Sequence, residues 1–460
     1  MKMLEILFLI LCINVLASCK TEIDTAQSEP LPKSDNKEDK VEDVCLLPEA
    51  IDRKIEQYVK ANPITFNINY LSSIKVSVSK SKTLKNIGFS ERFFKYIPDG
   101  GFSLIKSKKS CLWYLFIPEF MSFRAIGNSP LYEDFKVKFK KPVLSTKDHS
   151  VNRFDNGGSW LMPVFWLNDK LIGFVHTEDH FFPNLENHVP WKNISVSYSS
   201  DEGRTWSKRE RILSSHLPGE RPKSIEWSGA GDQTVIYDHI NKRWVAIYFD
   251  RIPNKKNISS FEETAADETY SAHYNEKVTK ADESDLLNKD EDIKSRYIIV
   301  DPKSIPTVPA ELRSGITIAS SLNSEARPDT WFKLYNGQFS EPGMGGKFTV
   351  ISSLSKAKAL GLSLNWIEEI KKWVLLFTKF DNKLWMTFTS DLTDWTSPQL
   401  GIVLTKYPNT ITYPTLLQLD KKNGREYQIL FSESNRLTHK ATGVRVLKSL
   451  RIEFKDYVAN

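Results

Sequence analysis

A pair of strands recurs five times along the chain, and this repeat restricts the fold more than any other feature of the sequence. In each copy an apolar strand runs into a polar turn, and the second strand begins with a bulky apolar residue and ends in a polar cluster. The copies span residues 102–119, 160–179, 232–251, 361–380 and 413–434. Polar residues typical of hairpin turns stand in the middle of four copies. Repeated units pack side by side to share a core, so the sequence predicts a repeated β architecture.

A second, more polar pair of strands follows several hairpins, at 193–213, 315–339 and 384–404. Four antiparallel strands form one blade, and five blades around an axis form an all-β, five-bladed β-propeller. We expect residues 69–80 to pair with 441–454 and close the last blade, because ring closure removes exposed sheet edges. Hairpins alone do not specify how sheets are arranged, so a two-sheet sandwich or two tandem β domains remain alternatives.

Charge and cysteine content exclude several classes of protein. The chain of 460 residues contains 63 Lys and Arg against 57 Asp and Glu, a net charge of +6. Proteins that bind nucleic acid concentrate basic residues in a patch, so no nucleic-acid partner is predicted. Four cysteines are too few for a disulfide scaffold. Cys45 and Cys111 form either one disulfide or two free thiols, and the sequence leaves both alternatives open.

Residues 1–18 have the properties of a secretory signal peptide. The uncharged run at 6–17 is too short to span a bilayer. Cys19 follows Leu-Ala-Ser, which resembles the lipobox of bacterial lipoproteins, in which the thiol after the cleavage site carries the lipid. The resemblance implies a lipid-anchored, extracytoplasmic protein of the cell envelope, and Lys20 in place of Asp favours the outer membrane. A plain signal peptide that ends before a Cys is the alternative.

The mature chain is predicted to consist of a tether and one folded domain. Residues 19–45 contain almost no large apolar side chain, so they cannot offset the entropy of folding and are predicted to be a flexible, lipidated tether. Residues 46–460 form the predicted β-propeller domain. Within that domain, residues 254–295 form a charged insertion, which is either a mobile surface segment or a lid over a site.

Two turn motifs carry a resemblance to known propellers. Residues 199–206, Ser-Ser-Asp-Glu-Gly-Arg-Thr-Trp, fit the Asp-box pattern S-x-D-x-G-x-T-W of sialidases and related proteins. Residues 390–396 resemble the S-x-D-x-x-x-W turn of five-bladed glycosidases. In such a turn the Asp accepts hydrogen bonds, the Gly supplies a positive φ and the Trp packs between blades. Residues 95–440 therefore resemble the five-bladed propellers of arabinanases, xylosidases and invertases.

Acidic residues gather at one predicted edge of the hairpins. The first strand of an antiparallel hairpin starts where the second ends, so both positions lie on one face of a propeller. The candidate catalytic residues on this face are Asp99, Asp155, Glu178 and Asp232. His176 stands two residues before Glu178, on the same side of its strand.

The chemistry of sugar hydrolysis gives these acids their predicted roles. Glycoside hydrolysis needs one carboxyl group as acid and another as base or nucleophile. The resemblance to glycosidases implies that Asp99 is the base and that Glu178 is the acid. It also implies that either Asp155 or Asp232 is the second Asp. Plain turn capping is the alternative for Asp99 and Asp155, since glycines follow both.

The candidate substrate-binding residues lie at the same edge or in one aromatic loop. His180, Arg251 and Tyr413 occupy strand starts or ends. Trp331 and Glu341 belong to a loop whose Trp, Tyr, Asn, Glu and Gly content is typical of sugar-binding loops. A polar rim and a glycine-bent connection between blades are the structural alternatives. No compact metal-ligand motif is present in the sequence, so neither a metal nor an organic cofactor is predicted, apart from a structural Ca²⁺ ion.

These features together predict a lipid-anchored, extracytoplasmic protein that handles carbohydrate. The leading hypothesis is a glycoside hydrolase that acts on a poly- or oligosaccharide through paired carboxylates. A non-catalytic glycan-binding protein and an interaction lipoprotein of the envelope are the alternatives, because propellers host many unrelated functions. The sequence does not specify the sugar, the linkage, the stereochemistry or the oligomeric state.

Overall fold

The computed structural model describes most of the predicted domain. It covers residues 45–70, 74–138, 141–145, 154–155, 157–179, 191–215, 228–252, 314–355, 359–379, 381–396, 399–421, 424–438 and 444–456. All of these belong to one unit, Val44–Asn460, and Met1–Asp43 form a separate unit. The predicted signal peptide, the lipidation site Cys19, nearly all of the tether, His180 and the insertion at 254–295 lie outside the described residues.

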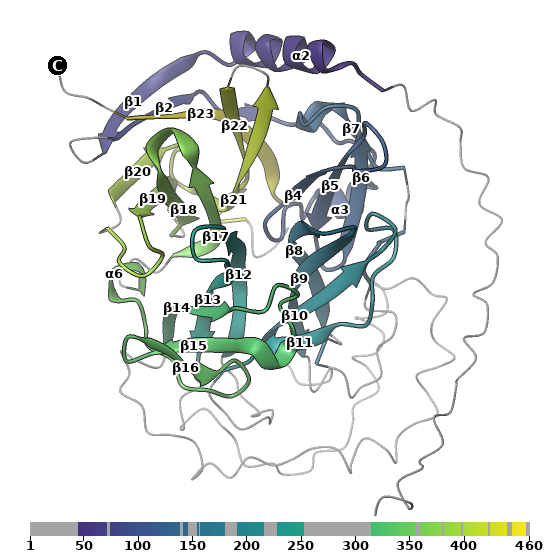
Figure 1. Cartoon of the computed structure of the whole chain (residues 1–460). Coiled ribbons are helices and arrows are strands. Elements are labelled where there is room, and N and C mark those ends of the chain that lie inside the picture. Colours follow the sequence, from purple (N-terminus) through teal and green to yellow (C-terminus); the bar gives the residue numbers. More distant parts are fainter. Residues whose placement is uncertain are drawn as a thin grey trace, which may run out of the picture. The chain divides into compact units, whose positions relative to one another are not determined.

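Five antiparallel hairpins form the centre of the described structure (Figure 1). They are β4 (Ser103–Lys106) with β5 (Trp113–Pro118), β8 (Gly158–Leu167) with β9 (Lys170–Asp179), β12 (Ser228–Asp238) with β13 (Arg243–Arg251), β17 (Leu360–Ile367) with β18 (Lys372–Thr378), and β21 (Asn409–Lys421) with β22 (Gly424–Asn435). Each hairpin coincides with one copy of the sequence repeat. The prediction of a mainly β architecture is therefore confirmed for the described residues.

Further strands extend each hairpin into a sheet. They are β6 (Ser122–Gly127) and β7 (Phe135–Lys136), then β10 (Trp191–Ser199) and β11 (Glu210–Leu213), then β14 (Ser314–Ser321), β15 (Trp331–Tyr335) and β16 (Gln338–Pro342), and then β19 (Lys383–Thr389) and β20 (Gln399–Val403). The last hairpin is extended by β23 (Val446–Asp456), β2 (Ile74–Ser79), β1 (Ile64–Tyr70) and β3 (Lys82–Thr83). The pairing of β2 with β23 confirms the expected contact between residues 69–80 and the last strand of the domain, and β1 lies outside β2.

One pairing between hairpins was not expected from the sequence. The start of β10 runs parallel to the start of β12, with Lys192 opposite Gly229, and this joins the second and third hairpins into one sheet of nine strands. Gly229 has a φ of +98°, and a Cβ atom there would lie 2.2 Å from the carbonyl oxygen of Lys192. Only glycine fits so close to the neighbouring backbone. The pairing places the side chain of Lys192 beside the third hairpin.

Four hairpins carry a β-bulge at the same place in their first strand. Two residues there face one residue of the partner strand, at 162–163, 232–233, 361–362 and 413–414. The first bulge residue has a positive φ in three cases, +52° at Asp232, +59° at Gly361 and +52° at Tyr413. A non-glycine residue rarely adopts this conformation, and such strain is concentrated at functional sites. The bulges thus take Asp232 and Tyr413 out of the regular strand geometry.

A second regularity follows each bulge and links neighbouring hairpins. The Oγ atom of Ser103 accepts a hydrogen bond from the backbone N–H of Val164 at 3.1 Å. Hydrogen bonds join the other neighbouring hairpins in the same way. In three of them a side-chain oxygen accepts from a backbone N–H, and in the fourth a Gln side chain donates to a backbone oxygen. They are Met162–Gln233, Thr234–Leu364, Ser363–Leu416 and Thr415–Phe102. The last of these links the fifth hairpin back to the first.

The turn at 199–206 is held by its acidic side chain. The carboxylate of Asp201 accepts hydrogen bonds from the backbone N–H groups of Arg204 and Thr205 at 3.0 and 2.9 Å, and from the Thr205 hydroxyl at 2.6 Å. Trp206 packs edge-on against Phe116, with ring centroids 5.8 Å apart. The turn therefore anchors the second sheet to the first, which is a structural role.

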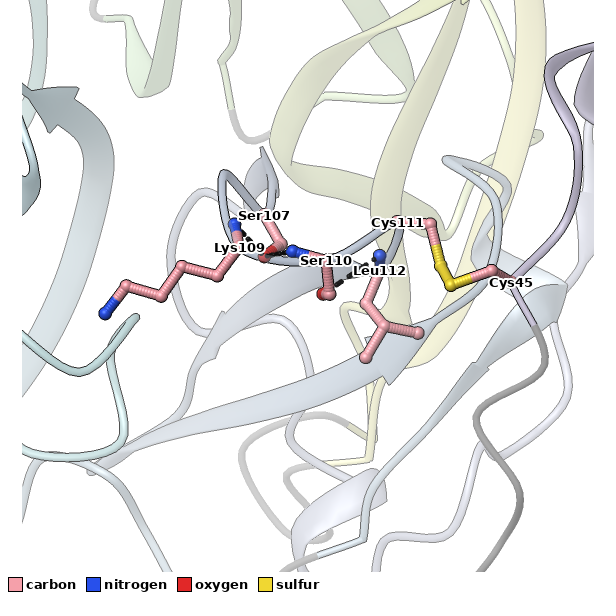
Figure 2. The surroundings of a disulfide bond; sticks show 6 residues. All are labelled: Cys45, Ser107, Lys109, Ser110, Cys111 and Leu112. Atoms are coloured by element: carbon pink, nitrogen blue, oxygen red, sulfur yellow. Dashed lines mark hydrogen bonds between the residues drawn. A yellow bond between two sulfur atoms is a disulfide. The ribbon is translucent and has the colours of Figure 1, made fainter.

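Helix α2 (Pro48–Ala61) packs on the outside of the sheets through Ile55 and Tyr58. A disulfide between Cys45 and Cys111 ties the start of this segment to the β4–β5 turn, with Cα atoms 5.5 Å apart (Figure 2). The structure thus contains the disulfide alternative and not the two free thiols. Helices α3 (Glu91–Phe94) and α6 (Ser352–Ser355) are single turns. In the described part of the chain, no helix is both long and apolar enough to cross a membrane.

Removal of this disulfide is expected to lower the free energy of unfolding by about 2–4 kcal/mol. The bond closes a loop with a sequence separation of 66 residues, so its loss increases the conformational entropy of the unfolded chain. Urea unfolding of the oxidised protein and of Cys111→Ser measures the difference. A reductant should destabilise the wild type and leave Cys111→Ser unchanged, and equal urea midpoints for the two proteins would contradict the prediction.

Candidate functional site

Three carboxylates predicted from the sequence lie together at one end of the hairpins. Asp99 precedes β4, Glu178 lies near the end of β9 and Asp232 is the first bulge residue of β12. All three act electrostatically on Lys192, and all three act on Tyr413. The exposed fraction of the side chain is 26% for Asp99, 9% for Glu178 and 27% for Asp232. We call Asp99, Glu178 and Asp232, with their immediate partners, the carboxylate cluster.

Asp232 is paired with Lys192. The Nζ atom of Lys192 donates to Oδ2 of Asp232 at 2.6 Å, a contact that depends on the parallel pairing of β10 with β12. Burial alone would raise the pKa of Asp232, but the charge and hydrogen bond of Lys192 together with His176 outweigh burial, and the pKa is lowered. Burial likewise opposes the charge of Lys192, and the carboxylates of Asp232 and Glu178 outweigh it and raise the pKa of Lys192. Both groups are therefore charged at neutral pH.

Asp99 is held by two donors from distant parts of the chain. Arg445 donates from Nη1 to Oδ1 at 2.7 Å, and the indole N–H of Trp160 donates to Oδ2 at 3.1 Å. Arg445 also donates to the carbonyl oxygens of Tyr96 and Pro98. Burial opposes the charge of Arg445, but Asp99 outweighs it and raises the pKa of Arg445. Asp99 thus has both oxygens engaged by donors from other segments, which goes beyond simple turn capping.

Glu178 lies against the imidazole of His176. The two residues alternate along β9 and so share one face of the sheet. The Nε2 atom of His176 lies 3.3 Å from Oε1 of Glu178, and the Nδ1 atom accepts a hydrogen bond from the backbone N–H of Asp232 at 2.9 Å. The ring of Trp160 meets the imidazole edge-on, with centroids 5.1 Å apart. The second and third hairpins therefore position Glu178 together.

Tyr413 completes the described cluster from the fifth hairpin. The guanidinium group of Arg445 lies 5.2 Å from the centre of its ring. Burial raises the pKa of Tyr413, and the negative charge of Asp99 raises it further. The phenol therefore stays protonated and can donate a hydrogen bond at any physiological pH. Tyr413 was a predicted substrate-binding residue, and the structure places it with the carboxylates.

Other predicted site residues lie elsewhere. Asp155, the alternative second Asp, is fully buried and forms an ion pair with Arg209. Trp331 is 1% exposed, and its indole N–H donates to the carbonyl oxygen of Ala326 at 3.1 Å. This Trp packs in a hydrophobic core on the nine-stranded sheet. The structure therefore does not bring Asp155 or Trp331 to the carboxylate cluster.

Two further candidates take part in backbone interactions. Glu341 lies in the outer strand β16 and accepts a hydrogen bond from the backbone N–H of Lys347 at 3.0 Å. Arg251 ends β13, and its carbonyl oxygen accepts a hydrogen bond from the Ser215 hydroxyl at 3.3 Å. Trp331 and Glu341 thus lie in two paired strands of the nine-stranded sheet, β15 and β16, rather than in a loop or a connection between blades.

The cluster contains cations that sequence reasoning did not identify. Lys192 follows a Trp, Arg445 stands between two Val residues, and neither belongs to a motif. Within the described ranges, no group of three or more His, Cys, Asp or Glu side chains is placed to hold a metal ion. Here the protein's own cations neutralise two of the acids. Chemically, the cluster offers two carboxyl groups paired with cations, one carboxyl group beside an imidazole and one phenolic donor.

Comparisons with known proteins give weak structural similarity only. No family model and no curated protein match the chain. An α-L-arabinofuranosidase from Lactobacillus brevis is 9% identical, with a TM-score of 0.44 over 81% of this chain and 94% of that one. An exo-β-1,3-galactanase from Clostridium thermocellum is 9% identical, with a TM-score of 0.42 over 83% of this chain and 63% of that one. A GH43_1 enzyme from Xanthomonas citri complexed with xylotriose is also 9% identical, with a TM-score of 0.42 over 78% and 87% of the two chains.

Proposed function

We propose that this protein is a glycoside hydrolase whose active site is the carboxylate cluster. The observation that carries the proposal is the convergence of Asp99, Glu178 and Asp232, which come from three separate hairpins and share one set of charged neighbours. Glycosidases need two carboxyl groups in different protonation states across the scissile bond. Ion pairs hold Asp99 with Arg445 and Asp232 with Lys192, and the imidazole of His176 lies against Glu178.

The proposed roles follow from these environments. Glu178 is the general acid, which protonates the oxygen of the leaving sugar. Asp99 is the base, and its two donors hold both carboxylate oxygens in place. Asp232, tied to Lys192, is the second Asp and maintains the charge balance around the acid. The phenol of Tyr413 is a donor to a sugar hydroxyl. No organic cofactor is needed for this chemistry.

The proposal includes the finer architecture and the location of the protein. The five hairpins, linked in order by their post-bulge hydrogen bonds and from the fifth back to the first, support a five-bladed propeller with the cluster at its axis. The run at 6–17 and the residues before Cys19 support lipid anchoring and an extracytoplasmic location, in the outer membrane if the host has one. A poly- or oligosaccharide is the proposed partner.

A carbohydrate panel tests the proposed function. We expect the protein lacking its leader to release reducing ends from at least one poly- or oligosaccharide. Asp232→Asn should lower turnover about 10²–10⁴-fold while a thermal shift with the same sugar persists, because the substitution removes the charge that balances Lys192. Reducing-end release and thermal shift are measured together.

Asp169→Asn is the matched control, since Asp169 lies in the β8–β9 turn at the opposite end of its hairpin from Glu178. It should retain full turnover. A thermal shift without sugar release would favour the alternative, a non-catalytic glycan-binding lipoprotein. No response in either measurement across a broad panel would refute the carbohydrate proposal and favour an interaction lipoprotein of the envelope.

A further inference from the structure

We propose that His176 is a positioning residue that assigns the acid proton of Glu178 to its Oε2 atom. The inference rests on the proposed function, because it concerns the group that acts as the acid. It follows from the hydrogen bonds at the two ring nitrogens of His176 and from the packing around the imidazole. The proposed reaction then depends on His176 as well as on the paired carboxylates.

The tautomer of His176 is determined by a backbone group. The N–H of Asp232 points at Nδ1 and lies 2.9 Å from it. A backbone N–H can only donate, so Nδ1 must be the unprotonated nitrogen that accepts. In a neutral imidazole the proton then resides on Nε2. The bulge at Asp232 therefore sets the protonation of a side chain on the neighbouring hairpin.

The Nε2 proton in turn orders the carboxyl group of Glu178. Nε2 lies 3.3 Å from Oε1, so the N–H donates to that oxygen. The carbonyl oxygen of a protonated carboxyl group is a better acceptor than its hydroxyl oxygen, so this bond favours the acid proton on Oε2. During glycosidic cleavage that proton moves to the leaving oxygen, which also keeps the electron pair of the broken C–O bond. The carboxylate that results still accepts from Nε2–H.

Charged groups around the imidazole come from several strands. Glu178 on β9 and Asp232 on β12 favour a positive ring, with Oδ1 of Asp232 3.9 Å from Nδ1. Lys192 on β10, paired with Asp232, opposes a second positive charge nearby. Trp160 on β8 presents an uncharged ring. A proton on Nδ1 would face the N–H of Asp232, so the neutral Nε2–H form is the one that satisfies every contact.

Close packing keeps the imidazole in this position. The side chain of His176 is only 4% exposed. A Cβ atom at Gly231 would lie 2.6 Å from Cε1 and 2.7 Å from Nδ1 of the ring. Gly231→Ala would therefore displace the imidazole without changing a titratable group. The chain thus offers one variant that removes the ring and another that only moves it.

The first test compares pH profiles of hydrolysis. His176→Leu should lower kcat about 10- to 100-fold with KM within about threefold of the wild type, because the acid is misplaced and the sugar contacts remain. Loss of a donor to the carboxylate raises the pKa of Glu178, so the basic limb of the kcat profile should move to higher pH. Gly231→Ala should shift it in the same direction. His176→Gln, whose Nε2–H can still donate, should restore most of the wild-type limb.

A lower kcat with an unmoved basic limb in His176→Leu and Gly231→Ala would show that His176 acts only through packing, and the proposal would be wrong. Thermal unfolding of each variant identifies a loss of folded protein. His176→Gln is expected to remain folded, since it preserves a polar side chain of similar length.

The second test needs no substrate. In protein with ¹⁵N-labelled histidine, the His176 signals, assigned through His176→Gln, should show an unprotonated Nδ1 and a protonated Nε2 in the neutral ring. An Nδ1–H tautomer of the neutral ring would overturn the proposal. If the protein hydrolyses no sugar but His176 shows the expected tautomer, the proposed hydrolase function is wrong and the assigned hydrogen bonds of His176 stand. Failure of the proposed function and failure of the His176 proposal are therefore distinguishable.

Discussion

Glu178→Gln is expected to lower kcat for hydrolysis about 10²–10⁴-fold while the protein remains folded. The amide preserves the shape of the side chain and can still accept from Nε2 of His176, but it carries no acidic proton for the leaving oxygen. Kinetics with two substrates of the same sugar separate this role from that of Asp99. An aryl glycoside, whose leaving group needs little protonation, should retain much more activity with Glu178→Gln than an alkyl glycoside.

Asp99→Asn should instead reduce the hydrolysis of both substrates, since the base is needed whatever the leaving group. Glu210→Gln is the matched control, because Glu210 is exposed on β11, an outer strand of the sheet that contains Glu178. It should behave as the wild type. Equal losses with aryl and alkyl substrates in Glu178→Gln would remove Glu178 from the role of acid.

The largest expected effect on stability comes from a buried ion pair between β15 and β13. Lys333→Met is expected to lower the free energy of unfolding by about 3–5 kcal/mol. Lys333 and Asp250 are both fully buried, with Nζ and Oδ2 3.1 Å apart. Nζ also donates to the carbonyl oxygens of Ser214 and Gly346. Burial lowers the pKa of Lys333, and Asp250 opposes that change. Methionine fills the space but leaves the carboxylate of Asp250 buried beside no cation.

Urea unfolding of three variants checks this prediction. Lys347→Met, at an exposed lysine that follows β16, should change the free energy of unfolding by less than about 0.5 kcal/mol. The double variant Lys333→Met/Asp250→Leu should recover much of the loss, because an apolar pair replaces the uncompensated charge. If Lys333→Met unfolds at the wild-type urea concentration, the pair contributes nothing to stability and the argument from burial is incorrect.

The hairpins were predictable because their signal is local. Alternating apolar strands around a polar turn specify a hairpin within about 20 residues, and all five were found at their predicted places. The edge rule for antiparallel strands also placed Glu178 and Asp232 on a common face, and both lie in the cluster. Tyr413 followed from the same rule, and His176 followed from its alternation with Glu178 along one strand.

The partners of these acids were not predictable because they depend on pairings between distant segments. Arg445 lies 346 residues from Asp99, and Lys192 reaches Asp232 only through the parallel pairing of β10 with β12. The sequence could not decide between Asp155 and Asp232, since both follow or precede glycines in polar stretches. An internal ion pair with Arg209 distinguishes Asp155 in the structure. Trp331 was misleading because an aromatic ring suits a sheet interior as well as a sugar.

The repeated bulge separates the part of the chain that builds the framework from the part that performs chemistry. Met162, Asp232, Gly361 and Tyr413 occupy equivalent first-bulge positions, yet they are a thioether, an acid, a hydrogen atom and a phenol. The strand pairing of each hairpin is made by the residues on either side of its bulge. The bulge therefore fixes the backbone at these positions without fixing one side chain, except at Gly361, where a Cβ atom would lie 2.8 Å from the backbone of Tyr413. A scaffold of this kind can acquire a new substrate through a few substitutions while its strands stay the same.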